Sequence, residues 1–349
     1  HTRYDGQSTW DPYLTSSSWH GVTTCVFGNC GVGFAPVKKG KEKYLINLME
    51  GVEDIPESVL SEGIDFCWET FPEYLNALEN SNRIMDIGTQ VPHSALRFFV
   101  MGEDGANHLC KPNDEQILKM KSLLEEALYA GALGVSTSRT TKHKSADGNL
   151  IPSLNADDKE LAGIAEALKN TKKGLLQCNS DMGPVEMELL IQAAKHSGQP
   201  LSVLLIQYNE FPDRWKDTLN HISYANRNGI KTTGQVGSRP IGVLMGFNTS
   251  VNPFSSHEAW QKIKHLSNKE RNNIIKEDIN IRNSLINDVP DNGHTKWVQN
   301  TFSLTYLLKE PLNYEPTKEM SINSIASKLN KKPWEIILDH FTSSDNDEF

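Results

Sequence analysis

Short apolar runs rich in β-branched residues alternate along this chain with longer stretches of helical period, and this alternation constrains the fold more than any other feature. It is typical of a parallel sheet whose strands are joined by crossover helices. Six runs have the length and composition of interior strands: 22–28, 85–91, 134–138, 174–178, 201–207 and 230–236. The sequence therefore predicts an α/β fold with a parallel sheet.

The segments between these runs predict helices with recognisable ends. Segment 113–130 begins at Asn113, a good N-cap residue, and is followed by Gly131. Segments 155–169 and 184–196 repeat the pattern, and a final pair is expected at 321–329 and 333–341. Two longer connections, 34–83 and the mostly helical 246–311, interrupt the rhythm, and long loops of this kind usually build the site of a barrel.

Composition excludes several classes of partner. With 44 acidic and 35 basic residues among 349, the formal charge is −9, which opposes attraction to phosphate backbones and argues against nucleic acid. No apolar run approaches the length of a membrane helix. Five scattered cysteines without a close pair predict no disulfide framework, and without a secretory signal we expect a cytoplasmic protein.

Polar residues stand wherever a predicted strand ends, and catalytic groups of parallel barrels come from these ends. His93, Ser138, Arg139, Gln207 and Arg239 are the candidates for binding a substrate, Arg139 through a bidentate pair with a carboxylate. The alternative for His93 is a hydrogen-bonded structural histidine.

His1 and Cys30 are the candidate metal ligands. His1 and Arg3 have the spacing of an H-x-H metal motif, but arginine has no lone pair to offer an ion. Cys30 lies among small residues, so its sulfur could bind zinc or attack an acyl group. The alternatives are a terminal histidine without a role and a buried, inert cysteine.

Several separated stretches resemble the N-acyl-D-amino-acid deacylase (D-aminoacylase) branch of the amidohydrolase superfamily. They are residues 1–7, 10–12, 18–24, 28–36, 49–56, 131–134, 239–242 and 314–317, which together extend over nearly the whole chain. The resemblance implies a (β/α)8 TIM-like barrel with a small β-sandwich, hydrolysis of the amide C–N bond of a small acylated amino acid, and zinc as cofactor. It also implies that His1 and Cys30 occupy metal-ligand positions.

The resemblance further implies that the barrel is incomplete in residues 1–349. The six predicted strands match strands two to seven, so strands one and eight and the β-sandwich are expected to be largely missing. The whole chain is then one partial catalytic barrel, with 246–311 as a helical insertion after strand seven. No aspartate of the strand-eight type is found, so we expect residues 1–349 alone to be inactive.

The sequence departs from the family pattern in ways that keep other functions open. Arg3 stands where a second histidine is expected, and Asn179, Asp181 and Gln207 stand where relatives supply histidine ligands, so a normal zinc shell is not assembled. Besides a metal-dependent hydrolase, the chain could be a non-catalytic barrel that binds an acylated ligand. A third possibility is a thiol enzyme using Cys30, with His20 or His93 as base.

Overall fold

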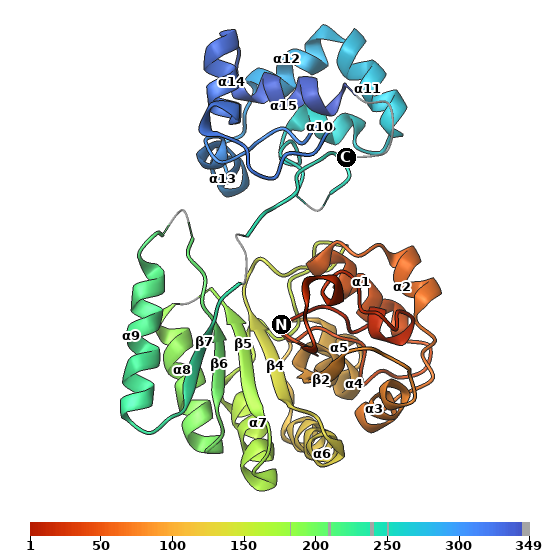
Figure 1. Ribbon diagram of the computed structural model, residues 1–349, viewed down its shortest axis with the longest axis vertical. Helices are drawn as coiled ribbons and strands as arrows, with labels where there is room; N and C mark the ends of the chain where they lie inside the picture. Colours follow the sequence, from red (N-terminus) through yellow and green to blue (C-terminus); the bar gives the residue numbers. More distant parts are fainter. Residues whose placement is uncertain (182, 209–210, 238–240, 250, 344–349) are drawn as a thin grey trace. The chain divides into compact units, whose positions relative to one another are not determined.

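A computed structural model describes residues 1–181, 183–208, 211–237, 241–249 and 251–343, which divide into two compact units, His1–Pro240 and Ile241–Phe349. The first unit contains all the strands of the described chain (Figure 1). They are β1 Thr24–Phe27, β2 Asp86–Thr89, β3 Val91–Pro92, β4 Gly134–Arg139, β5 Leu175–Ser180, β6 Leu201–Leu204 and β7 Thr232–Gln235.

All the strand pairs are parallel, in the orders β1-β2 and β3-β4-β5-β6-β7. The six predicted strands are confirmed, with one difference. The predicted strand 85–91 divides at Gln90 into β2, which pairs with β1, and β3, which pairs with β4. Gln90 donates its N–H to the Phe27 carbonyl at 3.0 Å, so the chain stays beside β1 through this break.

The helices of the first unit connect the strands and cover the sheet. They are α1 Glu42–Glu53, α2 Glu57–Gly63, α3 Phe71–Glu79, α4 His93–Met101, α5 Glu103–Ala106, α6 Asp114–Ala130, α7 Asp158–Thr171, α8 Pro184–Ser197 and α9 Arg214–Arg227. Helix α6 begins where predicted, because the Asn113 side chain accepts the Gln116 N–H and the Gln116 side chain accepts the Asn113 N–H. Helix α7 begins three residues later than predicted, after the cap Asp157.

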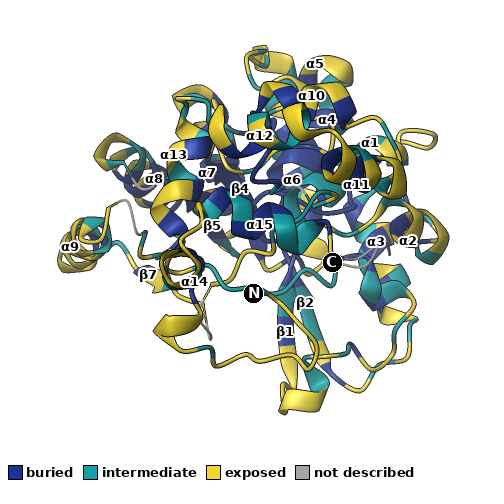
Figure 2. Ribbon diagram, turned by 90° about the horizontal axis from the view of Figure 1, so that it is seen from above, coloured by how far each residue is buried: buried dark blue, intermediate teal, exposed yellow. Residues whose placement is uncertain are grey.

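Burial follows the layers of this unit. Every residue of β4 is buried, and α6, α7 and α8 pack one beside the next with their apolar faces inward. Figure 2 shows buried residues along β4 and β5, whereas α9 is largely exposed. The parallel α/β architecture fits the barrel class expected from the sequence.

The second unit is helical. It contains α10 Glu258–Ile263, α11 Asn268–Glu277, α12 Ile279–Asn287, α13 Gly293–Thr301, α14 Ile322–Leu329 and α15 Pro333–Phe341. Its own apolar core includes Phe254, Trp260 and Trp334. The predicted helical segment 246–311 lies within it, but the unit begins at Ile241 and continues through α14 and α15. Its place as an insertion in a barrel stays a prediction.

No helix of the described chain is long and apolar enough to cross a bilayer.

Candidate functional site

The carboxyl ends of the parallel strands bring polar side chains from distant parts of the chain together. Cys30 follows β1, and its N–H donates to Gln177 Oε1 on β5 at 2.6 Å. Gln177 Nε2 in turn lies 4.0 Å from the Cys30 sulfur. We call His1, Arg3, Cys30, Glu53, Ser138, His143, Gln177, Asn179 and Gln235 the strand-end cluster.

The imidazole of His1 and the thiol of Cys30 lie side by side, as the sequence predicts. Cys30 Sγ is 3.5 Å from His1 Nε2, and His1 Nδ1 is 3.0 Å from Gln235 Oε1 at the end of β7. The Thr2 N–H donates to the Val26 carbonyl at 3.0 Å, which holds this first segment along β1. The role of His1 and Cys30 as metal ligands stays a prediction.

A tight turn places Cys30. Gly28, Cys30 and Gly31 have φ values of 69°, 52° and 71°, in the left-handed region that favours glycine. A Cβ on Gly28 would lie 2.1 Å from the Gln90 carbonyl oxygen, so only glycine fits there. Burial raises the pKa of the Cys30 thiol, although the Arg3 charge opposes the rise. Cys30 is therefore a neutral, buried thiol, which favours the inert alternative over a nucleophile.

Arg3 is held in the cluster by two groups. Its Nε lies 2.7 Å from Glu53 Oε1 at the end of α1, and its Nη1 donates to the Asn29 carbonyl at 2.5 Å. Its charge also acts on the Cys30 thiol and lowers the pKa of that thiol against the effect of burial. Burial raises the pKa of the Glu53 carboxyl, and the Arg3 charge opposes that rise. A cation thus sits next to the sulfur, with an acidic partner of its own.

His143 belongs to the cluster and was missed by sequence reasoning. Its Nδ1 lies 2.9 Å from Ser138 Oγ, and its Nε2 lies 3.1 Å from Asn179 Nδ2. Burial lowers its pKa to about 3, and the Arg3 charge adds to the effect, so the ring is neutral at pH 7. His143 lies in a loop five residues beyond Ser138, and its polar neighbours in sequence gave no sign that the loop folds back over the strand ends.

Ser138 is brought into the cluster, but Arg139 is not. Successive residues of a strand face opposite sides, so these neighbours cannot both point to the same site. The Arg139 guanidinium instead pairs with Glu186 in the first turn of α8 and donates to the Ala156 carbonyl at 2.6 Å. It connects β4 to the helix layer.

His93 also lies away from the cluster. Its Nδ1 is 2.9 Å from Thr137 Oγ1, and its Nε2 is 2.9 Å from Glu160 Oε1, which Arg97 also binds. The side chain is fully buried, and both ring nitrogens have partners in the protein. This environment favours the structural alternative for His93.

Of the two remaining predicted substrate-binding residues, Gln207 is not in the cluster. Gln207 is exposed beyond the end of β6, and its Nε2 donates to the Pro212 carbonyl at 3.4 Å. Arg239 lies outside the described residues.

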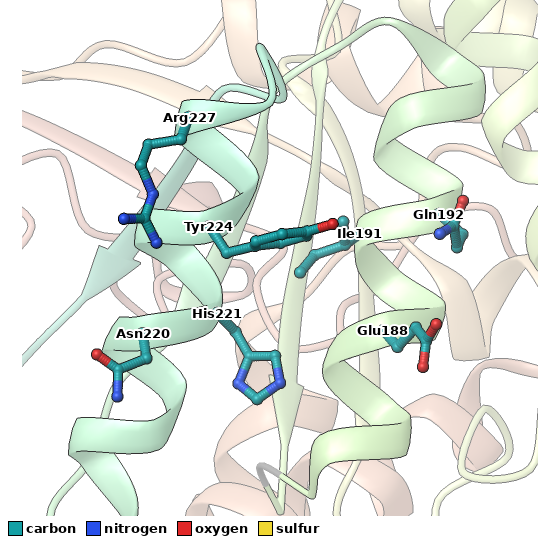
Figure 3. Close-up of a pocket in the computed structure, with 7 residues that line it drawn as sticks. All are labelled: Glu188, Ile191, Gln192, Asn220, His221, Tyr224 and Arg227. Carbon is teal, nitrogen blue, oxygen red and sulfur yellow. The ribbon is translucent and has the colours of Figure 1, made fainter.

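A separate surface groove lies between α8 and α9. It has a volume of about 540 Å³ and is lined by Glu188, Ile191, Gln192, Asn220, His221, Tyr224 and Arg227. Figure 3 shows Tyr224 of α9 and Ile191 of α8 reaching toward one another across it. The groove is formed by the outer helices, whereas the cluster is formed by the strand ends, so it is not part of the candidate site.

The donors of the cluster do not form a zinc shell. A catalytic zinc ion takes about three protein ligands and a water molecule. Within the described ranges, no group of three or more His, Cys, Asp or Glu side chains is arranged to hold a metal ion. His1 and Cys30 supply two donors, and a guanidinium occupies the space beside them.

Comparison with known proteins gives matches over most of the chain. The model of the amidohydrolase family matches residues 1–277. D-aminoacylase of Alcaligenes xylosoxydans xylosoxydans is 35% identical over 124 residues, 36% of this chain and 22% of the relative. N-acyl-D-aspartate deacylase of the same organism is 32% identical over 137 residues, 39% of this chain and 24% of the relative.

An uncharacterized protein of Mycobacterium tuberculosis is 34% identical over 139 residues, 39% of this chain and 22% of the relative. The chain thus matches less than a quarter of the length of these curated relatives.

Solved structures of D-aminoacylase share the fold. One superimposes with a TM-score of 0.51 and 23% identity, over 68% of this chain and 46% of that chain. Another, described for its binuclear metal center, has a TM-score of 0.54 and 18% identity, over 97% of this chain and 57% of that chain.

Proposed function

Because the chain belongs to the amidohydrolase family, we propose that its full gene product hydrolyses the amide C–N bond of N-acyl-D-amino acids or similar acylated amines. Two relatives are a D-aminoacylase and an N-acyl-D-aspartate deacylase by name, in agreement with the resemblance in the sequence. The substrate would be a small acylated amino acid.

The observation that carries this proposal is the convergence of Cys30, Ser138, Asn179 and Gln235 from four strand ends on one place. Strand ends of this kind hold the reacting groups of parallel barrels. We therefore propose that the parallel sheet is part of a (β/α)8 barrel whose pocket opens at these ends, with residues 246–311 inserted after β7.

Ser138 is the predicted substrate-binding residue that this proposal retains most directly, together with Asn179 and with His143, which sequence reasoning missed. The neutral His143 ring hydrogen-bonds Ser138 and Asn179, so it orients these two side chains at the carboxyl ends of β4 and β5. These groups offer donors and acceptors suited to an amide and a carboxylate. Gln207 and Arg239 remain proposals for the rim of the pocket.

Zinc is the cofactor that the resemblance implies, and one solved relative is described by its binuclear metal center. The described donors do not fit a zinc shell, so no catalytic step is assigned to a metal here. Zinc dependence of the gene product would require further donors from outside the described residues.

Release of free amino acid tests the proposal. The full gene product is incubated with matched N-acetyl-D- and N-acetyl-L-amino acids, and the amines released are separated on a chiral column. We expect release from the D-series. No release from any acylated amine in either series would contradict the proposal.

A matched pair of variants tests the place of the site. His143→Gln is expected to lower kcat/KM by roughly tenfold or more, the effect of one or two lost hydrogen bonds. His108→Gln, which alters a partly exposed histidine that contacts Asn155, is expected to leave kcat/KM unchanged. Equal effects of the two changes would place the reaction elsewhere.

A second function, binding without hydrolysis, is favoured by the Arg3–Glu53 pair beside Cys30. A guanidinium there suits an anionic ligand more than a metal-assisted reaction. Calorimetric binding of an N-acetyl-amino acid without release of product would support this second function against the first.

A further inference from the structure

The Arg3 guanidinium lies beside the Glu53 carboxylate and the turn that carries Cys30. Arg3 Nε lies 2.7 Å from Glu53 Oε1, and its Nη1 donates to the carbonyl of Asn29, the residue before Cys30. Cys30 Sγ in turn lies 3.5 Å from His1 Nε2. The arginine charge thus lies next to the turn that carries Cys30 and is paired with the Glu53 carboxylate.

The arginine is fixed rather than free to leave. Its Nη1 donates to the Asn29 carbonyl at 2.5 Å, and its side chain is only 13% exposed. Guanidinium stays protonated at every pH a protein tolerates, so the positive charge beside the sulfur is permanent. A divalent ion bound by Cys30 and His1 would lie next to this charge in a largely buried site, where the low dielectric constant strengthens the repulsion between them.

We propose that Arg3 is a built-in cation that takes the place of a divalent metal in the strand-end cluster. It pairs with Glu53, faces the Cys30 thiol and repels a metal ion from the two donors. Removal of the guanidinium removes this charge, so that His1 and Cys30 become available as an imidazole and a thiol donor of the kind that bind zinc or cobalt.

Cobalt titration tests this, because a cobalt–thiolate bond gives a near-ultraviolet charge-transfer band without any need for turnover. The full gene product is titrated with Co²⁺ at pH 8, and bound metal is counted after dialysis. The natural protein is expected to show no band that depends on Cys30. Arg3→Gln is expected to show the band and to bind Co²⁺ at least tenfold more tightly.

Matched variants assign the donors. Arg3→Lys keeps the charge and is expected to stay without the band. Arg3→Gln combined with Cys30→Ser is expected to lose the band, which separates this site from the other cysteines. Arg3→Met, of similar length and without charge, serves as a second test should Arg3→Gln fail to fold, as judged by circular dichroism.

Two results would overturn the inference: a Cys30-dependent cobalt band in the natural protein, or no such band in a folded Arg3→Gln or Arg3→Met variant. The inference concerns the same cluster as the proposed function, but its readout is independent of activity. Absence of hydrolysis would remove the proposed function alone, whereas a cobalt band in the natural protein would remove the inference alone.

Discussion

At the scale of single residues, Asp5 is the clearest case of a side chain whose ionised form is destabilised by burial. Its side chain is 1% exposed; Oδ1 accepts the Gly28 N–H at 2.7 Å, and Oδ2 is buried with no hydrogen-bond partner among the described residues. Burial raises the pKa of Asp5 to about 7, and the nearby Arg3 charge opposes the rise. Burial therefore favours the protonated form of this carboxyl in the folded protein.

Asp5→Asn is therefore expected to stabilise the protein at alkaline pH. A raised carboxyl pKa means that the folded state holds a proton the unfolded state releases, so the cost of Asp5 grows as pH rises from about 4 to about 7. The gain of the variant should be absent near pH 4 and largest above pH 7, at most about 4 kcal/mol. Urea unfolding at pH 5 and pH 8 measures it.

Asp147→Asn, a change at an exposed loop position, is the control and should leave the difference in unfolding free energy between pH 5 and pH 8 unaltered. A pH-independent effect of Asp5→Asn would show that the carboxyl is ionised throughout.

The candidate site was predictable only in part, for reasons visible at single positions. The adjacency of His1 and Cys30 followed from parallel strand ends, which any βαβ pattern brings together. Ser138 and Arg139 were both candidates, yet the pleat allows one of them to face the site, and which one depends on the register with β5. His143 depends on the path of a loop, which no periodicity encodes.

At the scale of elements, the strands were predicted well because each is a short apolar run bounded by glycine or a polar residue. The division of the second strand at Gln90 was not predicted, because it depends on which strands the two halves pair with: β2 pairs with β1, and β3 pairs with β4. Helix ends were predicted where a cap is unambiguous, as at Asn113, and missed at Asp157, where Asn155 competes in sequence.

The Arg139–Glu186 pair joins two elements, β4 and α8, and its removal should loosen them. Arg139→Met leaves Glu186 without its partner and is expected to lower the free energy of unfolding by roughly 3 kcal/mol, because a partly buried carboxylate remains. Arg139→Met with Glu186→Leu is expected to recover most of this loss. Chemical unfolding of the three proteins measures the effect.

The same pair decides between two roles for Arg139. If Arg139 connects β4 to α8, the double variant folds and its KM for an acylated amino acid is close to that of the natural protein. A large rise in KM in a variant of normal stability would instead indicate that Arg139 binds the substrate.

At the scale of the whole molecule, the division at residue 240 was not foreseen. The sequence favoured one partial barrel with the helical segment 246–311, rich in lysine and asparagine, as an insertion. The residues Phe254, Trp260, Ile275, Leu285 and Trp334 belong to one buried cluster, so the second unit has an apolar centre of its own, and its place as an insertion in a barrel stays a prediction.

That centre contains a histidine that makes the second unit sensitive to acid. His257 is fully buried against Phe254 and Trp334, and neither of its ring nitrogens has a hydrogen-bond partner in the described chain. Burial lowers the pKa of His257 to about 4. Since unfolding lets the ring return to its ordinary pKa near 6.5, the unfolded state binds the proton first, and stability is lost as pH falls from about 6.5 to about 4.

His257→Phe should remove this sensitivity, because phenylalanine fits the same aromatic contacts without a proton to bind. We expect the natural protein to lose up to about 3 kcal/mol from the second unit between pH 7 and pH 4, and the variant to lose less. Calorimetry at both pH values follows the transition, and His265→Phe, outside the buried core, is the control. An equal loss in the natural protein and in His257→Phe would assign the acid sensitivity to other groups.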